Sequence, residues 1–359
     1  VCQTNHMPNR ATISDVARLA GVSKSTVSRV LNNNLQYIRP ETVEQVRNSI
    51  EALGYQPSSV ARSLVSKRTL SVGLLISDVG NPFYSEVIRG VEEIALQQNY
   101  NVFLCNTSYD HARGLKFIQS LVNKQVDGVL LMSSSVSDEW INELARCRTP
   151  VVALDWHPTA LVTEGSVGVI GVDFEAGIHQ AVNHLIELGH RRFAHVSGPL
   201  GLHTSCARQQ AFIKALENHG ISPESVVTLE ANLRLDGGRG ALERLALLPE
   251  PPTGVFAAND LTAIGLVWAA QQSGLLIPED LSVIGLDDIQ LAAEILPPLT
   301  TVAMPRSEIG QMAMEMLLEL INNAPEAKGI ANSIDVSTSL VVRQSTGPAP
   351  DLVKRWRLP

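Results

Sequence analysis

A short stretch near the N-terminus gathers basic and hydroxyl-bearing side chains at helical spacing. Lys24, Ser25, Ser28 and Arg29 stand at i, i+1, i+4 and i+5, so a helix over this stretch presents them on one face. Such a face can donate hydrogen bonds to phosphates and to base edges in the DNA major groove. The pattern predicts a DNA-reading helix; the plainer alternative is a helical hairpin whose polar face is only solvated.

The neighbouring residues predict the two helices that would position this face. Thr12 and Asp15 form an N-terminal cap pair for the first helix, and Gly21 can supply the positive φ that ends it. Ser23 is a natural cap for a second helix that runs to about Asn32. The first helix is expected to bury residues at i, i+3, i+4 and i+7, namely Ile13, Val16, Ala17 and Ala20.

A third helix completes a small helical unit. Pro40 suits the first turn of a helix, and Gly54 ends the apolar pattern that follows it. Arg39 stands where a small capping residue is usual, which predicts a weaker helix start. We therefore expect an all-α helix-turn-helix head over residues 10–56.

Residues 57–69 form a linker of unusual content. Val60, Ala61 and Leu64 make a short apolar stripe, which could become a helix of about two turns only when something packs on it. A leucine presented in this way can enter the minor groove between base steps and kink the duplex. The alternative is an ordinary flexible linker.

From residue 70 the chain alternates between apolar runs and helical patterns, such as the helix expected over residues 83–98. Seven runs suit buried parallel strands: 71–77, 101–105, 127–132, 150–154, 192–197, 254–258 and 281–286. Because the rhythm restarts near residue 192, we expect two doubly wound α/β lobes within residues 70–346. The tail, 347–359, has no heptad pattern.

Polar residues follow several of these expected strands. In open α/β sheets, ligands bind at the carboxyl ends of strands, so a cleft between two lobes would collect such side chains. The residues at these positions are Asp78, Asn81, Asp155, Asn259, Asp260, Asp287 and Asp288.

The net charge of −8 is unevenly distributed. Residues 1–70 hold nine Lys/Arg and four Asp/Glu, a net +5, so the remainder carries −13. A basic head on an acidic body fits a DNA binder with its polyanion affinity at one end.

No apolar run reaches the roughly 18 residues of a membrane span, and no export signal is expected. The four cysteines have no paired spacing, which favours a reducing cytoplasm.

Sequence motifs for catalysis are missing. There is no Gly-x-Gly-x-x-Gly after a strand, no phosphate-binding Gly-Lys-Ser/Thr loop, no nucleophile elbow and no His-Glu-x-x-His. We therefore expect no catalytic residues, metal or cofactor, and we interpret the strand-end acids as ligand-binding groups. A sugar-modifying enzyme is the remaining catalytic alternative.

With head, linker and body in place, the chain resembles the LacI/GalR family of transcriptional regulators over nearly its whole length. The stretches that carry the resemblance are DVARLAGVSKSTVSRVLN, LGYQPSSVARSL, NPFYSEVIRGVE, LDW, FAANDLTAIG and VIGLDDIQLA. Within the family it is most similar to ribose-type regulators, at LCNT (residues 104–107), at LDW and at NPFY. The body also resembles ribose-type periplasmic sugar-binding proteins.

The resemblance implies roles for the head and linker. Lys24, Ser25 and Arg29 fall where the family reads base edges, and Leu64, with Val60 and Ala61, falls on the hinge-helix leucine. The family grips phosphates at the positions of Thr12, Thr26, Ser28 and Asn32.

The resemblance also implies an effector site in the body. Its members, as they stand in this chain, are Asn81, Phe83, Tyr84, Asp155, Trp156, Arg208, Asn259 and Asp287. Two positions depart from the ribose-type pattern: Met304 replaces a glutamine, and Leu233 or Leu235 stands where an aromatic ring stacks.

Together these features imply a cytoplasmic, homodimeric repressor that binds a pseudo-palindromic operator and responds to a sugar held between its lobes. A purine or sugar-phosphate corepressor is the first alternative, because Trp156 follows Asp155 in purine-responsive members too. A sugar-binding transport protein is the second. The sequence leaves open whether the effector is an inducer or a corepressor.

Overall fold

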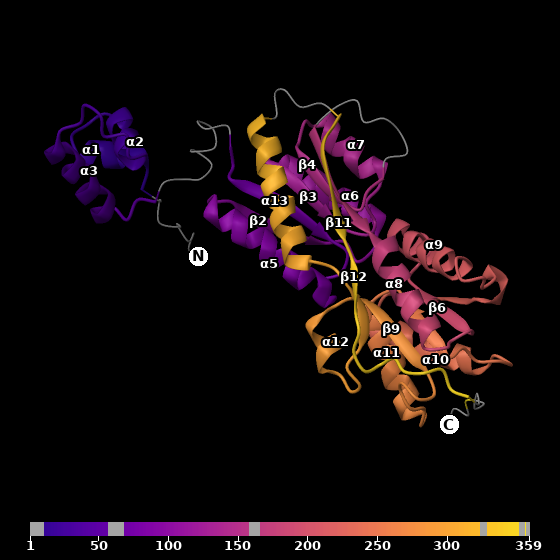
Figure 1. The fold of residues 1–359 in the computed structure, drawn as a ribbon. Helices are drawn as coiled ribbons and strands as arrows, with labels where there is room; N and C mark the ends of the chain where they lie inside the picture. Colours follow the sequence, from indigo (N-terminus) through magenta and orange to yellow (C-terminus); the bar gives the residue numbers. More distant parts are fainter. Residues whose placement is uncertain (1–10, 57–67, 158–165, 324–328, 352–355, 357–359) are drawn as a thin grey trace, which may run out of the picture. The chain divides into compact units, whose positions relative to one another are not determined.

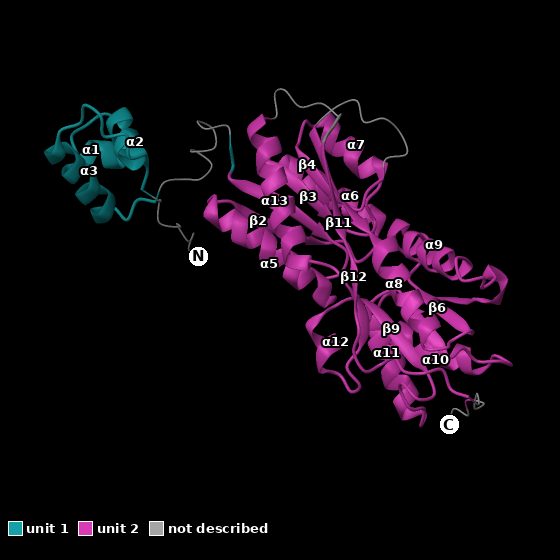
Figure 2. Cartoon of the chain, in the orientation of Figure 1, with its two compact units in different colours: residues 1–69 teal, residues 70–359 magenta. Residues whose placement is uncertain are grey.

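The computed structural model describes residues 11–56, 68–157, 166–323, 329–351 and 356, with the side chains of 329–331 excluded. The chain divides into two units, residues 1–69 and 70–359, coloured teal and magenta in Figure 2. We call the first the head and the second the body, and describe each by itself. The linker residues Val60, Ala61 and Leu64 lie outside the described residues.

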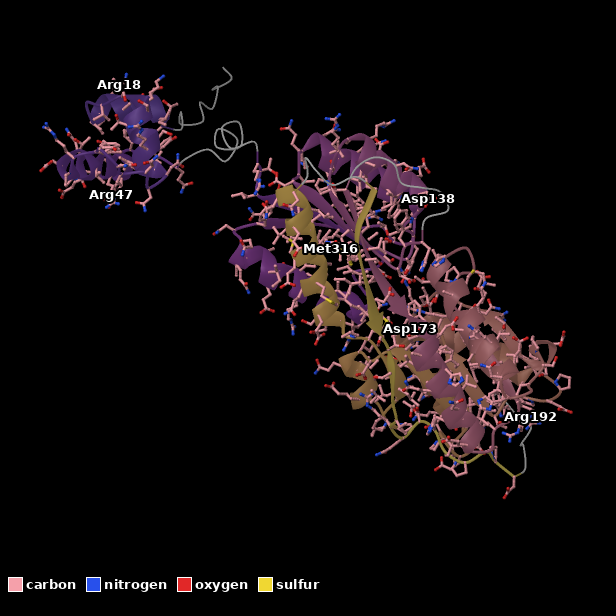
Figure 3. All side chains as sticks on the ribbon, turned by 45° about the horizontal axis from the view of Figure 1, so that its top comes forward. Arg18, Arg47, Asp138, Asp173, Arg192 and Met316 are labelled. Carbon is pink, nitrogen blue, oxygen red and sulfur yellow. The ribbon has the colours of Figure 1, made fainter. Side chains whose placement is uncertain are left out.

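The head contains the three expected helices: α1 (Ile13–Leu19), α2 (Lys24–Leu31) and α3 (Pro40–Ala52). They share one small apolar core, whose buried members are Val16, Ala17, Ala20, Val27, Val30, Val43 and Val46. Arg18 and Arg47 lie on the surface around this core (Figure 3). The spacing of the apolar residues thus correctly predicted which faces are buried.

The helix ends of the head follow the expected capping chemistry. Thr12 and Asp15 form a reciprocal capping box, in which the Thr12 amide donates to Asp15 Oδ2 at 3.0 Å. Ser23 caps α2 by accepting a hydrogen bond from the Thr26 amide at 3.1 Å, and Gly21 between the helices has a φ of +63°. Arg39 makes no side-chain capping bond to α3, as its type predicts.

The body consists of two α/β lobes (Figure 1). Lobe 1 comprises residues 70–173 and 306–337, and its six parallel strands run in the order β11-β5-β4-β3-β1-β2. The strands are β1 (Ser71–Ile76), β2 (Asn101–Asn106), β3 (Gly128–Met132), β4 (Val151–Leu154), β5 (Ser166–Asp173) and β11 (Gly329–Ser337). The helices are α5 (Pro82–Gln97), α6 (His111–Asn123), α7 (Asp138–Arg146) and α13 (Arg306–Asn323). Helices α5 and α13 cover one face of the sheet, and α6 and α7 cover the other.

Lobe 2 comprises residues 174–305 and 338–351, and its sheet has the order β12-β10-β9-β8-β6-β7 with β12 antiparallel to β10. The strands are β6 (Phe193–Ser197), β7 (Val227–Glu230), β8 (Gly254–Ala257), β9 (Ser282–Asp287), β10 (Thr300–Ala303) and β12 (Ser339–Val341). The helices are α8 (Phe174–Glu187), α9 (His203–Glu217), α10 (Leu235–Ala246), α11 (Asp260–Gln272), α12 (Gln290–Glu294) and the 3₁₀ turn η1 (Pro223–Ser225).

The chain crosses between the lobes three times: from β5 into α8, from β10 into α13, and from β11 into β12. Asp173, labelled in Figure 3, marks the first crossing, where its side chain caps α8 through the Ala176 amide. Two doubly wound lobes were expected, and this expectation is confirmed. Strands β5, β7, β10, β11 and β12 were not anticipated, because several are half-exposed or rich in polar residues and lack a continuous apolar run.

Candidate DNA-reading face and effector pocket

The outer face of α2 has the geometry that DNA reading requires. Lys24, Ser25 and Arg29 are exposed, on the side of the helix opposite the buried Val27 and Val30. The backbone of α2 is held by its capped first turn and by the apolar core beneath it. A fixed helix with exposed cationic and hydroxyl groups can enter a major groove without reorganising its backbone. The Ser25 hydroxyl shares a hydrogen bond of 2.7 Å with the hydroxyl of Ser23.

The four predicted phosphate-contact residues lie at helix ends or beside the reading face. Thr12 Oγ1 donates to Asp15 Oδ2 at 2.7 Å, so its hydroxyl is already part of the α1 cap. Thr26 and Ser28 are half-buried on α2, and Asn32 is its exposed C-cap. The structure therefore places Thr26, Ser28 and Asn32 on α2 or at its end, and Thr12 at the start of α1.

A pocket lies between the two lobes of the body. It encloses about 510 Å³, including the part open to solvent. Seven of the eight predicted effector residues line it: Asn81, Phe83, Tyr84, Asp155, Arg208, Asn259 and Asp287. The polar and aromatic residues that the sequence reasoning missed are Tyr109, Ser133, Ser134, Phe174 and Thr204.

Lobe 1 supplies a mostly neutral wall. Asn81 caps α5 by accepting a hydrogen bond from the Phe83 amide at 3.0 Å, which fixes the first turn of that helix. The rings of Phe83 and Tyr84 meet edge to face at 5.0 Å. The Tyr84 hydroxyl is hydrogen-bonded to Ser77 and Ser134, and burial raises its pKa. This wall offers ring faces and neutral hydrogen-bonding groups.

Among the described residues, Asp155 is the one carboxyl group that lobe 1 brings to the pocket. It follows β4 with a φ of +48° and is 6% exposed. Burial raises its pKa, while His157, His203 and Arg208 act in the opposite direction. Its Oδ2 is buried without a hydrogen-bond partner among the described residues, and His203 Nδ1 lies 4.0 Å away. A ligand hydroxyl could satisfy a carboxyl group placed in this way.

Arg208 of α9 supplies a positively charged side chain to the pocket. Its guanidinium lies over the Phe174 ring, 4.7 Å from the centroid, and Nη1 donates to the Ala258 carbonyl at 2.6 Å. Its Nε is buried without a partner in the part of the chain described. Arg208 is therefore held rigidly while it retains hydrogen-bonding capacity.

Asn259 and Asp287 complete the wall of lobe 2. Asn259 caps α11 through the Thr262 amide, and its Nδ2 donates to the Leu233 carbonyl at 2.9 Å. Asp287 ends β9 with a φ of +121°, a conformation that favours glycine. Burial raises the pKa of Asp287 to about 8, with a smaller opposing effect of Arg208. This direction favours the protonated form of Asp287, which can both donate and accept a hydrogen bond.

The prediction that Trp156 belongs to the effector site is wrong. It does not line the pocket; its Nε1 donates to Asp138 Oδ1 at 2.9 Å, and its ring packs in the core beneath α7. Asp155 has a left-handed backbone conformation after the end of β4, and the chain that leaves this turn carries Trp156 into the apolar core.

Both departures from the ribose-type pattern lie at the pocket. Leu233 lines it and Leu235 does not, and Met304 lines it from the second crossing between the lobes. Ser133 and Ser134 directly follow β3, so the strand-end argument could have found them. Phe174 follows β5, a strand that was not predicted, and the sequence therefore carried no signal for it.

Neither a metal site nor a membrane span is found among the described residues. No group of three or more His, Cys, Asp or Glu side chains there could hold a metal ion. None of the described helices is long and apolar enough to cross a membrane.

Comparisons with known proteins agree with this arrangement. Residues 12–58 match the family model described as bacterial regulatory proteins, lacI family, and residues 182–346 match that of the periplasmic binding protein-like domain. Catabolite control protein A of Priestia megaterium is 36% identical over 336 residues, which cover 93% of this chain and 99% of that protein. The HTH-type transcriptional repressor PurR of Haemophilus influenzae (strain PittEE) is also 36% identical, over 93% and 98%.

Two solved structures are similar along most of their length. The lac repressor dimer bound to operator and the anti-inducer ONPF has a TM-score of 0.82 and 28% identity, covering 94% of this chain and 100% of that one. A LacI family regulator from Enterococcus faecium with bound ribose has a TM-score of 0.69 and 32% identity, over 77% and 99%. The chain thus belongs to the LacI family and is a DNA-binding transcriptional repressor with an effector-binding body.

Proposed function

We propose that a small neutral sugar, ribose or a close relative, binds in the pocket between the lobes and controls the affinity of the head for operator DNA. The observation that carries this proposal is the joint lining of the pocket by Asp155 from lobe 1 and by Arg208 and Asp287 from lobe 2. A ligand that bonds all three links the two lobes. Its binding energy can then shift their relative orientation.

The chemistry of the lining favours a polyhydroxylated ligand. Carboxyl groups and a guanidinium can bind ring hydroxyls in pairs, while the faces of Phe83 and Phe174 can pack on the carbon skeleton. Arg208 already donates to Ala258 and faces the buried carboxyl group of Asp155, which disfavours an additional phosphate on the ligand. The ribose-bound Enterococcus relative makes ribose the first ligand to test.

A purine is the second candidate effector. The pocket is lined by four aromatic side chains, Phe83, Tyr84, Tyr109 and Phe174, and a planar base could stack on one of them. Leu233 and Met304 add an apolar surface of the kind that a base also accepts. A purine would fit corepression as readily as induction.

On the DNA side, we propose that two copies of the chain bind a pseudo-palindromic operator in the cytoplasm. Lys24, Ser25 and Arg29 would read base edges. The phosphate contacts would come from Thr12, Thr26, Ser28 and Asn32, and the minor-groove contact from Leu64 with Val60 and Ala61. Exposed apolar residues on the edge strand β2, Phe103 and Leu104, support pairing of two bodies.

A thermal-shift panel on the full chain tests the effector. The panel contains ribose, other pentoses, hexoses, sugar phosphates, hypoxanthine and guanine. A ligand at about 100 times its dissociation constant stabilises the native state by about 2.7 kcal/mol, so binding is readily visible. A rise in melting temperature with a sugar supports the proposed effector. A rise with a purine alone favours the purine as the effector. If neither a sugar nor a purine raises the melting temperature, both candidate effectors are contradicted.

Operator binding is tested by selecting sites from randomised pseudo-palindromic DNA and titrating the selected duplex at several salt concentrations. Affinity should fall steeply as salt rises, because phosphate contacts release counterions. Arg29→Ala should relax base preference at the position it reads, whereas Thr26→Ala should weaken all sequences about equally. A flat salt response would contradict the assigned DNA contacts.

A further inference from the structure

An ion pair joins the two lobes beside the effector pocket. Asp78 lies in the loop after β1 of lobe 1, and Arg234 directly precedes α10 of lobe 2. Arg234 Nε and Nη2 both approach Asp78 Oδ2, at 2.9 and 2.7 Å. The partners are 156 residues apart in sequence, so the contact exists only while the lobes hold this orientation.

Both partners are held in place before they meet. Asp78 Oδ1 accepts a hydrogen bond from the Gly80 amide at 3.0 Å, and its side chain is 13% exposed. The Arg234 amide donates to Asn232 Oδ1 at 3.1 Å. The Asp78 carboxylate is thus ordered before the pair forms, whereas only the backbone of Arg234 is held and its side chain is 51% exposed, so forming the pair costs conformational entropy mainly at Arg234.

The loops that carry the ion pair also carry pocket walls. The Asp78 carbonyl accepts from the Asn81 amide at 3.0 Å, and Asn81 lines the pocket. On the other side Leu233, which precedes Arg234, lines the pocket with a φ of +62°, and Asn259 holds its carbonyl. A movement that opens the pocket therefore separates Asp78 from Arg234.

We propose that the Asp78–Arg234 ion pair is a clasp that closes the effector pocket, so that Arg234 is a positioning residue for an effector it does not line. This inference rests on the proposed function of the pocket. It has a specific consequence: binding of an uncharged sugar becomes sensitive to salt, because ions screen the clasp and not the ligand. Without the clasp, part of the binding energy of the effector is spent on closing the lobes.

Isothermal titration with ribose tests the clasp in the full chain. Arg234→Gln and Asp78→Asn should each weaken binding about three-fold, the range of a partly exposed ion pair, and the double variant should be no weaker than either. Raising salt from about 0.05 to about 0.5 M should weaken binding by the wild type and not by the double variant. Lys214→Gln breaks an ion pair inside lobe 2, between Lys214 and Glu175, and should leave ribose binding unchanged.

Hydrogen exchange on the ligand-free chain tests the clasp independently of the effector. Arg234→Gln should speed exchange of the Gly80 and Asn81 amides in lobe 1, and Asp78→Asn should speed exchange of the Arg234 amide in lobe 2. Unchanged exchange across the pocket in both variants, or additive effects on ribose affinity, would overturn the clasp. If the wild type binds none of the sugars of the thermal-shift panel, the effector proposal fails while the exchange experiment still decides on the clasp.

Discussion

The two lobes of the body share an arrangement of strands and helices and differ in the chemistry of the side chains that they bring to the pocket. Each has a six-stranded sheet in which five consecutive strands run in parallel, with a sixth strand from the C-terminal part of the chain at one edge. Each also brings two helices into backbone contact through a reciprocal pair of glycines. These pairs are Gly90 of α5 with Gly310 of α13 in lobe 1, and Gly238 of α10 with Gly265 of α11 in lobe 2.

The pocket walls show the difference. Among the described residues, lobe 1 contributes three aromatic rings, serines and one carboxyl group, whereas lobe 2 contributes the Phe174 ring, Arg208 and Asp287. Buried ionisable groups also lie behind the wall of lobe 2, where Asp260 and His195 are fully enclosed. We infer that packing imposes the shared arrangement of strands and helices, while the cation of the described pocket lining comes from lobe 2.

The largest expected effect tests the close helix packing that the two lobes share. A Cβ at Gly90 would overlap the Ser307 carbonyl oxygen, and one at Gly238 would overlap that of Thr262. Because backbone cannot yield as a side chain can, each alanine substitution should lower the free energy of unfolding by about 3 kcal/mol, measured by urea denaturation. Gly240→Ala, where a Cβ meets nothing within 4 Å, is the matched control. A loss of unfolding free energy in only one of the two variants would show that the two lobes do not depend on their glycine pairs in the same way.

The next prediction concerns a buried histidine of lobe 2. His195 donates from Nδ1 to the Phe256 carbonyl at 3.0 Å, and its Nε2 has no partner among the described residues. Burial lowers the pKa of His195 to about 4. The unfolded chain, with a histidine pKa near 6.5, therefore binds the proton first as pH falls. The contribution of neutral His195 to the free energy of unfolding is therefore fully present above pH 6.5. It decreases by about 3 kcal/mol as the pH falls towards 4.

Urea denaturation between pH 7 and pH 4 measures this loss. His195→Asn keeps an N–H donor and removes the titration, so the pH dependence of its unfolding free energy should be shallower than that of the wild type. His111→Asn, at an exposed ring in lobe 1, should change the slope far less. Equal slopes for wild type and His195→Asn would show that this histidine is not the ionising group.

A third prediction tests the charged wall directly. Arg208→Met keeps an apolar stem beside Phe174 and removes every donor, so affinity for the proposed sugar should fall about 100-fold. Arg239→Met is the matched control, because Arg239 also stacks on a ring in lobe 2, 4.1 Å from the Trp268 centroid, and does not line the pocket. Titration calorimetry on both variants compares them. Equal loss would mean that the effect of Arg208 is general destabilisation.

The smallest expected effect compares two helix caps at the pocket. Asn81→Ala should cost about 1 kcal/mol of unfolding free energy, the worth of a cap, and Asn259→Ala about 2 kcal/mol, because Asn259 also holds the Leu233 carbonyl. Asn→Asp preserves a cap and removes the donor. It should therefore be nearly neutral at Asn81 and still costly at Asn259, measured in the same denaturation series.

Local patterns predicted much of this molecule. The three helices of the head, their caps and their buried faces follow from spacing and residue type, since each depends on interactions within a few residues. Asp155, Asn259 and Asp287 could be found at the pocket because strand ends of a doubly wound sheet converge. The sequence by itself therefore determined the elements of the head, the lobed class of the body and the polar core of the pocket.

The tertiary structure decided what depends on contacts between distant segments. It places Leu233, and not Leu235, on the pocket wall and buries Trp156 against Asp138. It also brings Asp78 to Arg234, a contact that no local pattern encodes because the lobes must first be formed and joined by three crossings. A side chain's direction and its distant partner are set by packing of whole lobes, which residue spacing cannot convey.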